Sequence, residues 1–221
     1  MSGWTRVRNS SGYTFGEEIA NALTHGVGVG LAVAALAVLV TFAGLYGDAW
    51  RVVGFAIYGA TLILLYLAST MYHAFTSPRA KRVFKALDHA AIFLLIAGTY
   101  TPFTLVTLRG PWGWTLFGLI WGFALAGITF ETLFLGRYMK LVVGFYIAMG
   151  WLVVIAIKPL VDSLPLGGLL WVSGGGLAYT GGVAFYAWKS LPFSHAVWHL
   201  FVLAGSTCHF FAMWFYVLPM A

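Results

Sequence analysis

Long apolar stretches, separated by short groups of charged, glycine and proline residues, make up most of the chain. Seven such stretches occur, at approximately residues 20–46, 52–76, 87–108, 112–136, 139–160, 164–188 and 196–219. Each has about 20 residues or more, which is enough for a helix to cross about 30 Å of hydrocarbon. The pattern predicts an all-α fold with a single domain over residues 1–221, a polytopic membrane protein built as a seven-transmembrane helix bundle.

The composition supports a lipid environment. Of the 221 residues, 61% are hydrophobic and 8% are charged, whereas an ordinary soluble domain has about 25% charged residues. A globular protein of this length has too little interior to bury so many apolar side chains, so lipid must surround much of the chain. The first apolar stretch is too long for the core of a secretory signal, and we expect it to be retained. The single cysteine, Cys208, excludes an internal disulfide framework and a cysteine-rich metal site.

Basic residues in the short connections predict the orientation. With a cytoplasmic N-terminus, three basic residues fall outside, namely Arg51, Arg109 and Lys158. Nine fall inside: Arg6, Arg8, Arg79, Lys81, Arg82, Lys85, Arg137, Lys140 and Lys189. This excess predicts the N-terminus in the cytoplasm and the C-terminus outside. Because the basic residues are scattered among these connections, the net charge of +6 does not indicate a nucleic-acid partner.

Three histidines fall at the cytoplasmic ends of the predicted helices. His73 ends the second stretch, and His195 and His199 begin the seventh. His195 and His199 are four residues apart, so their imidazoles share one helix face. Zinc uses this pair spacing, with a third ligand from elsewhere, and three imidazoles are the ligand set of a catalytic zinc with an open position. The alternative is three interfacial histidines bonded to headgroups or to one another.

Asp88 and Ser69 are the candidate catalytic residues. An alanine, a valine and a tryptophan separate the two histidines of the pair, so the glutamate base of zinc proteases is missing and a base must come from another helix. Asp88 opens the third stretch at the same depth, where an ionisable group is costly and functional by default. Ser69 lies one turn before His73 and could bond a metal-bound water or an oxyanion. The alternative for Ser69 is a hydrogen bond to its own helix.

At these positions the chain resembles the progestin and adiponectin receptor superfamily, in its bacterial haemolysin III branch. The resemblance covers essentially the whole chain and rests on three motifs: Glu17-Glu-Ile-Ala-Asn21-Ala-Leu-Thr-His25-Gly26; Ser69-Thr-Met-Tyr-His73 with Leu87-Asp88; and Ser194-His195-Ala-Val-Trp-His199 continuing to His209-Phe210.

The resemblance implies a seven-helix bundle with the N-terminus inside and with zinc held by His73, His195 and His199. It also implies that Asp88 contacts a zinc-bound water, and we expect a multi-pass location in the plasma membrane, the inner membrane of a bacterium. The chain departs from its relatives at His89, where they often carry an aromatic residue, and the role of His89 stays open.

Two functions are compatible with these features. The first is a zinc-dependent hydrolase acting on a lipid amide or ester at the cytoplasmic leaflet; the kinship of the superfamily to alkaline ceramidases favours an amide. The second is a non-enzymatic membrane sensor or homeostasis protein whose zinc is structural, although an open fourth position favours catalysis. A cytolytic pore ranks last, because the chain has no amphipathic insertion segment. A membrane lipid is the expected partner, while the particular lipid and the oligomeric state are left open.

The other polar positions of the first helix and of the fourth have expected supporting roles. Glu17, Asn21 and His25 form a one-face row at the start of the first helix, where orienting the ligands or capping the helix is favoured over ligation. Glu131 lies near Arg137, and we expect a local ion pair.

The last two predicted helices carry features that predict close packing. His209 is ten residues beyond His199, about 15 Å deeper at the helical rise, so it cannot bind the same metal. Together with Ser206 it lines a cavity or, as the favoured alternative, holds its helix to a neighbour. Glycines at 174–176 and 181–182 mark the sixth predicted helix, where they indicate a close helix contact or a bend or, as the favoured alternative, the ordinary small-residue packing of a membrane helix.

Overall fold

The computed structural model describes residues 12–218, and all regular structure in that range is helical. Its elements are α1 (Phe15–Tyr46), α2 (Ala49–Ala74), α3 (Pro78–Pro102), α4 (Pro111–Leu133), α5 (Met139–Gly150), α6 (Ile157–Ser163), α7 (Leu166–Ala187) and α8 (Ser194–Ala212). Short π-helical turns extend α3 and α8, at Phe103–Thr107 and Met213–Val217. The predicted all-α class is confirmed.

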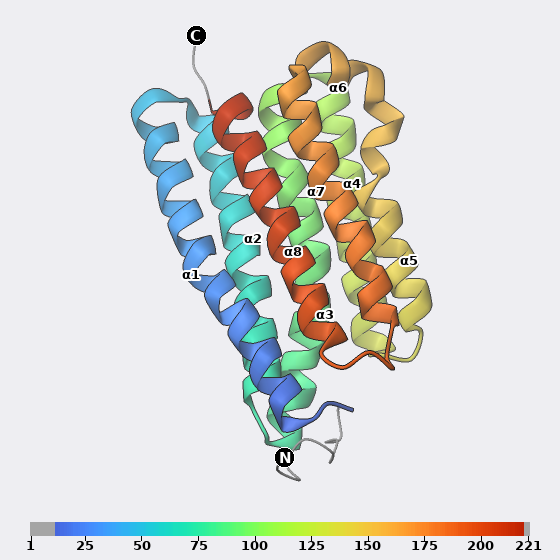
Figure 1. Cartoon of the computed structure of the whole chain (residues 1–221). Coiled ribbons are helices and arrows are strands. Elements are labelled where there is room, and N and C mark those ends of the chain that lie inside the picture. The colour runs from blue at the N-terminus through green and yellow to red at the C-terminus, as the bar shows by residue number, and fades with distance from the viewer. Residues whose placement is uncertain (1–11, 219–221) are drawn as a thin grey trace.

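The helices form one elongated bundle in which α1 starts and α8 finishes at opposite ends (Figure 1). Helix α8 packs on α7 and on α1, and α3 packs on α2 and α4. The fifth predicted stretch is a broken helix: α5 ends at Gly150, the 3-10 segment Leu152–Ala156 follows, and α6 completes the stretch.

Six helical segments of the described chain are long and apolar enough to cross a membrane: Phe15–Tyr46, Ala49–Ala74, Pro78–Thr107, Pro111–Leu133, Met139–Ser163 and Ser194–Val217. Helix α7 has 22 residues but is rich in glycine, which lowers its hydropathy. The predicted count of seven crossings and the predicted orientation are therefore not established by these segments. Arg6, Arg8 and the end of the last predicted helix at residue 219 lie outside the described residues.

Two helices begin earlier than the apolar pattern predicts. Helix α1 begins at Phe15 because Thr14 and Glu17 form a capping box, in which Thr14 Oγ1 accepts from the Glu17 N–H at 3.2 Å and Glu17 Oε2 accepts from the Thr14 N–H at 2.8 Å. Helix α3 begins with Pro78 and not at residue 87, since proline suits a first helical turn. Asp88 therefore lies well inside α3 and does not open it.

Small residues let α7 and α8 approach each other closely. A Cβ atom on Gly182 of α7 would lie 2.7 Å from Phe201 Cβ of α8, and one on Gly205 of α8 would lie 2.8 Å from the Tyr179 ring of α7. The outward faces carry exposed apolar side chains, for example Leu125 and Leu170. A surface of this kind suits lipid contact.

Candidate metal centre

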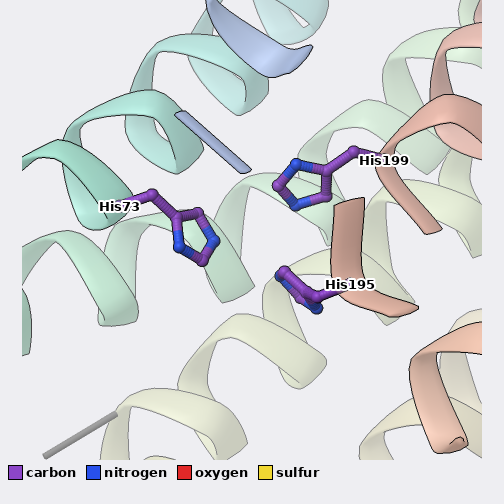
Figure 2. A group of neighbouring side chains, drawn as sticks. All are labelled: His73, His195 and His199. Carbon is purple, nitrogen blue, oxygen red and sulfur yellow. The ribbon is translucent and has the colours of Figure 1, made fainter. Parts of the chain in front are cut away.

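The structure brings together the three predicted ligands from the two ends of the chain. His73 lies in the last turn of α2, and His195 and His199 lie in the first two turns of α8. One ring nitrogen from each residue lies within 4.8 Å of the others. The ring centroids are 5.1 Å apart for His73 and His195, 5.4 Å for His73 and His199, and 4.6 Å for His195 and His199. Figure 2 shows the three rings around a common centre.

Unpartnered nitrogen atoms in this cluster fit a metal ion. His73 Nε2 and His195 Nδ1 are buried and have no hydrogen-bond partner. Buried polar atoms are nearly always satisfied, and a metal ion bound between these rings would give such nitrogens a partner. Three neutral imidazoles form a donor set that zinc prefers. The residues present therefore fit zinc.

Helix α1 orients His199 through its backbone. His199 Nδ1 lies 3.1 Å from the Asn21 carbonyl oxygen and 3.0 Å from Thr24 Oγ1. The Thr24 hydroxyl already donates its proton toward the carbonyls of Ala20 and Asn21, so it can only accept from the imidazole. Nδ1 therefore carries the proton and donates, which leaves the lone pair of His199 on Nε2.

His73 is oriented by a carboxylate that the sequence pattern did not single out. His73 Nδ1 donates to Glu18 Oε2 at 2.6 Å, and Lys81 Nζ donates to Glu18 Oε1 at 2.7 Å. Asn21 Nδ2 also lies 3.4 Å from His73 Nδ1. The row read from the sequence ran through Glu17, whereas Glu18 and Asn21, three apart on α1, share the face that meets His73. The spacing of three residues between Glu18 and Asn21 was therefore the feature of the sequence that could have predicted this contact.

The remaining first-helix residues support the cluster as expected. Glu17 caps α1, and its Oε1 accepts from the backbone N–H of Phe193 at 3.1 Å. Phe193 has φ 58°, the one positive value among non-glycine residues of the described chain, and it immediately precedes α8. Such strain persists only where the surroundings enforce it, so Glu17 helps to fix the start of α8. The His25 ring stacks on His199, with centroids 3.5 Å apart.

Tyr13 covers the cluster next to the start of α1. Its ring centroid lies 5.6 Å from that of His73 and 5.1 Å from that of His195. Burial raises the pKa of Tyr13 well above its ordinary value. The phenol therefore stays neutral and adds no negative charge beside the histidines.

Asp88 and Ser69 line the same cavity as His195 and His199. Asp88 is buried but does not belong to the group of close ligand atoms. The Ser69 hydroxyl lies close to Asp88 and does not bond back to its own helix, as its neighbour Thr70 does to the Tyr66 carbonyl at 2.7 Å. The alternative reading of Ser69 is therefore wrong, and its hydroxyl is available to the cavity.

Glu131 has a different partner from the one expected. Its Oε1 accepts from His89 Nδ1 at 2.6 Å and from the Gly136 N–H at 3.1 Å, while the Arg137 guanidinium lies 5.3 Å from the Tyr138 ring centroid. Gly136, at φ 71°, turns the chain so that its amide faces the carboxylate. The predicted pair of Glu131 with Arg137 is wrong, and His89 links α3 to α4.

Ser206 and His209 hold α8 to its neighbours. The Ser206 hydroxyl lies 2.8 Å from both the Tyr66 hydroxyl of α2 and the Tyr179 hydroxyl of α7. The His209 ring stacks on Tyr179 with centroids 5.7 Å apart, and it also lines the cavity. Both of the roles considered for His209 therefore apply.

The cavity has a volume of about 400 Å³. Its polar end contains Ser69, Asp88, His195 and His199, and the rest has mainly apolar walls from α3, α5, α6, α7 and α8, including Ile92, Leu95, Ile157, Leu160, Val183 and Val202. A polar end joined to an apolar chamber is suited to an amphiphilic molecule.

The fold and this site define an all-helical integral membrane protein with a histidine cluster buried near one end of its bundle. The chain belongs to the haemolysin-III related family, whose sequence model matches residues 13–210. This membership confirms the resemblance drawn from the three motifs.

Individual relatives match over nearly their full length. The chain is 51% identical to "Hemolysin-3" of Bacillus cereus, over 93% of this chain and 94% of that protein. It is 48% identical to "Hemolysin-3 homolog" of Bacillus subtilis (strain 168), over 92% and 96%. It is also 29% identical to "Monocyte to macrophage differentiation factor" of Homo sapiens, over 91% and 84%.

Proposed function

We propose that this protein is a zinc-dependent hydrolase that cleaves an amide or ester bond of a membrane lipid at the cytoplasmic leaflet of the plasma membrane. His73, His195 and His199 hold the metal. The observation that carries the proposal is the convergence of three imidazoles, with two unpartnered buried nitrogens, at the polar end of an apolar cavity.

The ligand number favours catalysis over a purely structural metal. Structural zinc sites usually fill all four positions with protein groups, whereas catalytic sites use three and keep one open. The close group contains three side chains among the described residues. When bound, zinc supplies Lewis-acid activation of water and of a carbonyl group near neutral pH.

Asp88 and Ser69 supply the remaining chemistry. Water adds to the carbonyl carbon while Asp88 accepts its proton, and Asp88 then returns the proton to the leaving nitrogen or oxygen as the bond to carbon breaks. The Ser69 hydroxyl donates a hydrogen bond to the oxygen on which negative charge develops. Both groups are buried, so these interactions are stronger than they would be in water.

The cavity supports a lipid substrate. The apolar chamber next to the polar end accepts an acyl chain, and the polar groups meet the bond at headgroup depth. The described helices present apolar side chains outward, which suits a protein surrounded by the lipids that it would cleave.

The test is turnover by purified protein in lipid nanodiscs, with ceramides, other N-acyl lipids and ester lipids as substrates. We expect hydrolysis of at least one class, a loss of activity in His199→Ala together with loss of zinc, and a decrease of about 10²- to 10⁴-fold in Asp88→Asn with zinc retained. Cys208→Ala, outside the cavity, serves as the control. A wild-type protein that holds zinc and leaves every lipid intact would refute the hydrolase.

A further inference from the structure

Lys81 is a buried cation beside the metal centre that the proposed chemistry does not use. Its exposed fraction is 7%, although it belongs to a run of basic residues at the start of α3 whose next member, Arg82, is exposed. An ammonium group is almost never buried unless it is paired. The partners of Lys81 therefore indicate its role.

Two of these partners come from different helices. Lys81 Nζ donates to Glu18 Oε1 of α1 at 2.7 Å and to the Tyr72 carbonyl oxygen of α2 at 2.9 Å. The Tyr72 carbonyl is in the last turn of α2, where backbone oxygens lack helical partners and carry the negative end of the helix dipole. Lys81 also lies 4.9 Å from the Tyr72 ring centroid. It thus joins α1, α2 and α3 at one point.

The same carboxylate contacts a proposed metal ligand. Glu18 Oε2 accepts from His73 Nδ1 at 2.6 Å while Glu18 Oε1 accepts from Lys81. An imidazole that donates through Nδ1 has its lone pair on Nε2, and His73 Nε2 is a buried atom without a partner. A carboxylate that bonds the far nitrogen of a ligating histidine fixes both its tautomer and its ring orientation.

We propose that Lys81 is a positioning residue of the metal centre, holding Glu18 against His73 Nδ1 so that His73 Nε2 faces the other two histidines. The proposal rests on the metal centre of the proposed function but not on its hydrolytic step. Without the ammonium group, the Glu18 carboxylate loses an ionic partner at 2.7 Å, and its position against His73 Nδ1 is held less firmly. The other polar neighbour of His73 Nδ1, Asn21 Nδ2, lies at 3.4 Å and is itself an N–H donor, so it cannot accept a hydrogen bond from a protonated Nδ1.

The test compares the zinc affinity of Lys81→Met, Lys81→Arg and Arg82→Met in detergent, by competition with a chromophoric chelator. We expect Lys81→Met to bind zinc about 10- to 100-fold more weakly and Lys81→Arg to recover most of the affinity. Arg82→Met removes the same charge at an exposed neighbouring position and keeps wild-type affinity. Wild-type affinity in folded Lys81→Met would overturn the proposal, even if lipid hydrolysis were established.

A double variant tests the proposal if Lys81→Met does not fold. If Lys81→Met does not fold, Lys81→Met/Glu18→Gln removes both charges together, and we expect it to fold and still bind zinc weakly; wild-type affinity would overturn the proposal.

Nitrogen-15 NMR of histidine-labelled, metal-free protein, with His73 assigned from His73→Gln, reads the tautomer without zinc. We expect His73 protonated at Nδ1 in the wild type and partly at Nε2 in Lys81→Met or, where that does not fold, in the double variant. An unchanged tautomer would refute the role of Lys81, whereas zinc-loaded protein that is inert on lipids would refute only the hydrolase.

Discussion

Single residues near the histidine cluster owe their roles to their neighbours more than to their residue types. Glu18, in the first turn of a helix, would ordinarily be explained by the helix dipole, yet it bonds His73 and Lys81. Lys81 counts in the sequence as one loop charge among nine, yet it is buried. Residue type and spacing identified the three histidines, but they did not identify the groups that orient them.

Asp48 shows a single-residue effect at the opposite end of the bundle. Its Oδ1 accepts from the Arg51 N–H at 2.9 Å and caps α2, and this backbone hydrogen bond lowers the pKa of Asp48. We expect Asp48→Ala to lower the free energy of unfolding by about 1 kcal/mol at pH 7. Because the folded pKa lies below the unfolded value of about 3.9, the contribution is complete above that value and is lost as the pH falls through the folded pKa.

The measurement for Asp48 is denaturant unfolding of the wild type and of Asp48→Ala at pH 7 and at a series of lower pH values, over which the difference between the two proteins should shrink as Asp48 becomes protonated. Asp162→Ala is the control, since its ion pair with Lys158 is exposed and worth little. Equal effects of Asp48→Ala at all of these pH values would contradict the capping explanation.

At the scale of elements, glycine positions decide how closely α7 and α8 pack. The glycines of α7 reduce its hydropathy, so that it falls outside the six apolar segments, but they also admit the side chains of α8. Because lipid gives helices no hydrophobic reason to associate, such close contact is what holds them together. The property that makes α7 a weak membrane segment by composition makes it a good packing partner.

Substitution of two glycines on α7 tests this packing. In Gly182→Ala the new methyl group meets Phe201 Cβ and the Trp198 ring, each at 2.7 Å, and we expect a loss of about 1–3 kcal/mol in unfolding free energy. Gly174→Ala meets only Cys208 Sγ at 4.0 Å, so we expect no loss and a gain of up to about 1 kcal/mol from helix propensity. Unfolding in mixed detergent measures both, and equal effects would count against close packing as the cause.

For the whole molecule, the topology decides whether the three histidines face the cytoplasm. The structure places α2 and α8 so that His73, His195 and His199 meet near one end of the bundle (Figures 1 and 2). The loop charges alone predict which side of the membrane that end faces, namely the cytoplasm. In the predicted topology, the connection before α7 and the connection after it lie on opposite sides of the membrane, so α7 must cross the membrane.

Cysteine labelling measures this topology directly. With Cys208→Ser as the background, single cysteines replace Arg82, Asp162 or Ser190, and intact cells are treated with a membrane-impermeant maleimide. We expect labelling from outside at position 162 and labelling only after permeabilisation at positions 82 and 190. If positions 162 and 190 react from the same side, α7 does not cross and the seven-helix prediction is wrong.

Metal removal tests the bundle as a unit. The proposed ligands come from α2 and α8, which are both packed on α1 and are also joined by hydrogen bonds from Tyr58 and Tyr66 to Ser206, so zinc would add a further link between these helices. Free zinc at about 100 times Kd adds about 2.7 kcal/mol, or roughly 5–10 °C in Tm for a chain of this size. We expect a chelator to lower Tm by that amount in the wild type and to have no effect in His195→Ala. Loss of one zinc per chain with an unchanged Tm would contradict this coupling.

The sequence by itself determined the helical class, the approximate helix boundaries and the three histidines, because apolar length and helical spacing are local properties of the chain. It missed the first turns of α1 and α3, where capping by Thr14 and a proline start replaced the apolar signal. Only the tertiary structure decided that Glu18 and Lys81 serve His73, that Ser69 is free of its own helix, and that Glu131 bonds His89. These contacts join residues on different helices. How each helix is rotated against its neighbours is set by tertiary packing, so it cannot be predicted from the pattern of residues along the chain.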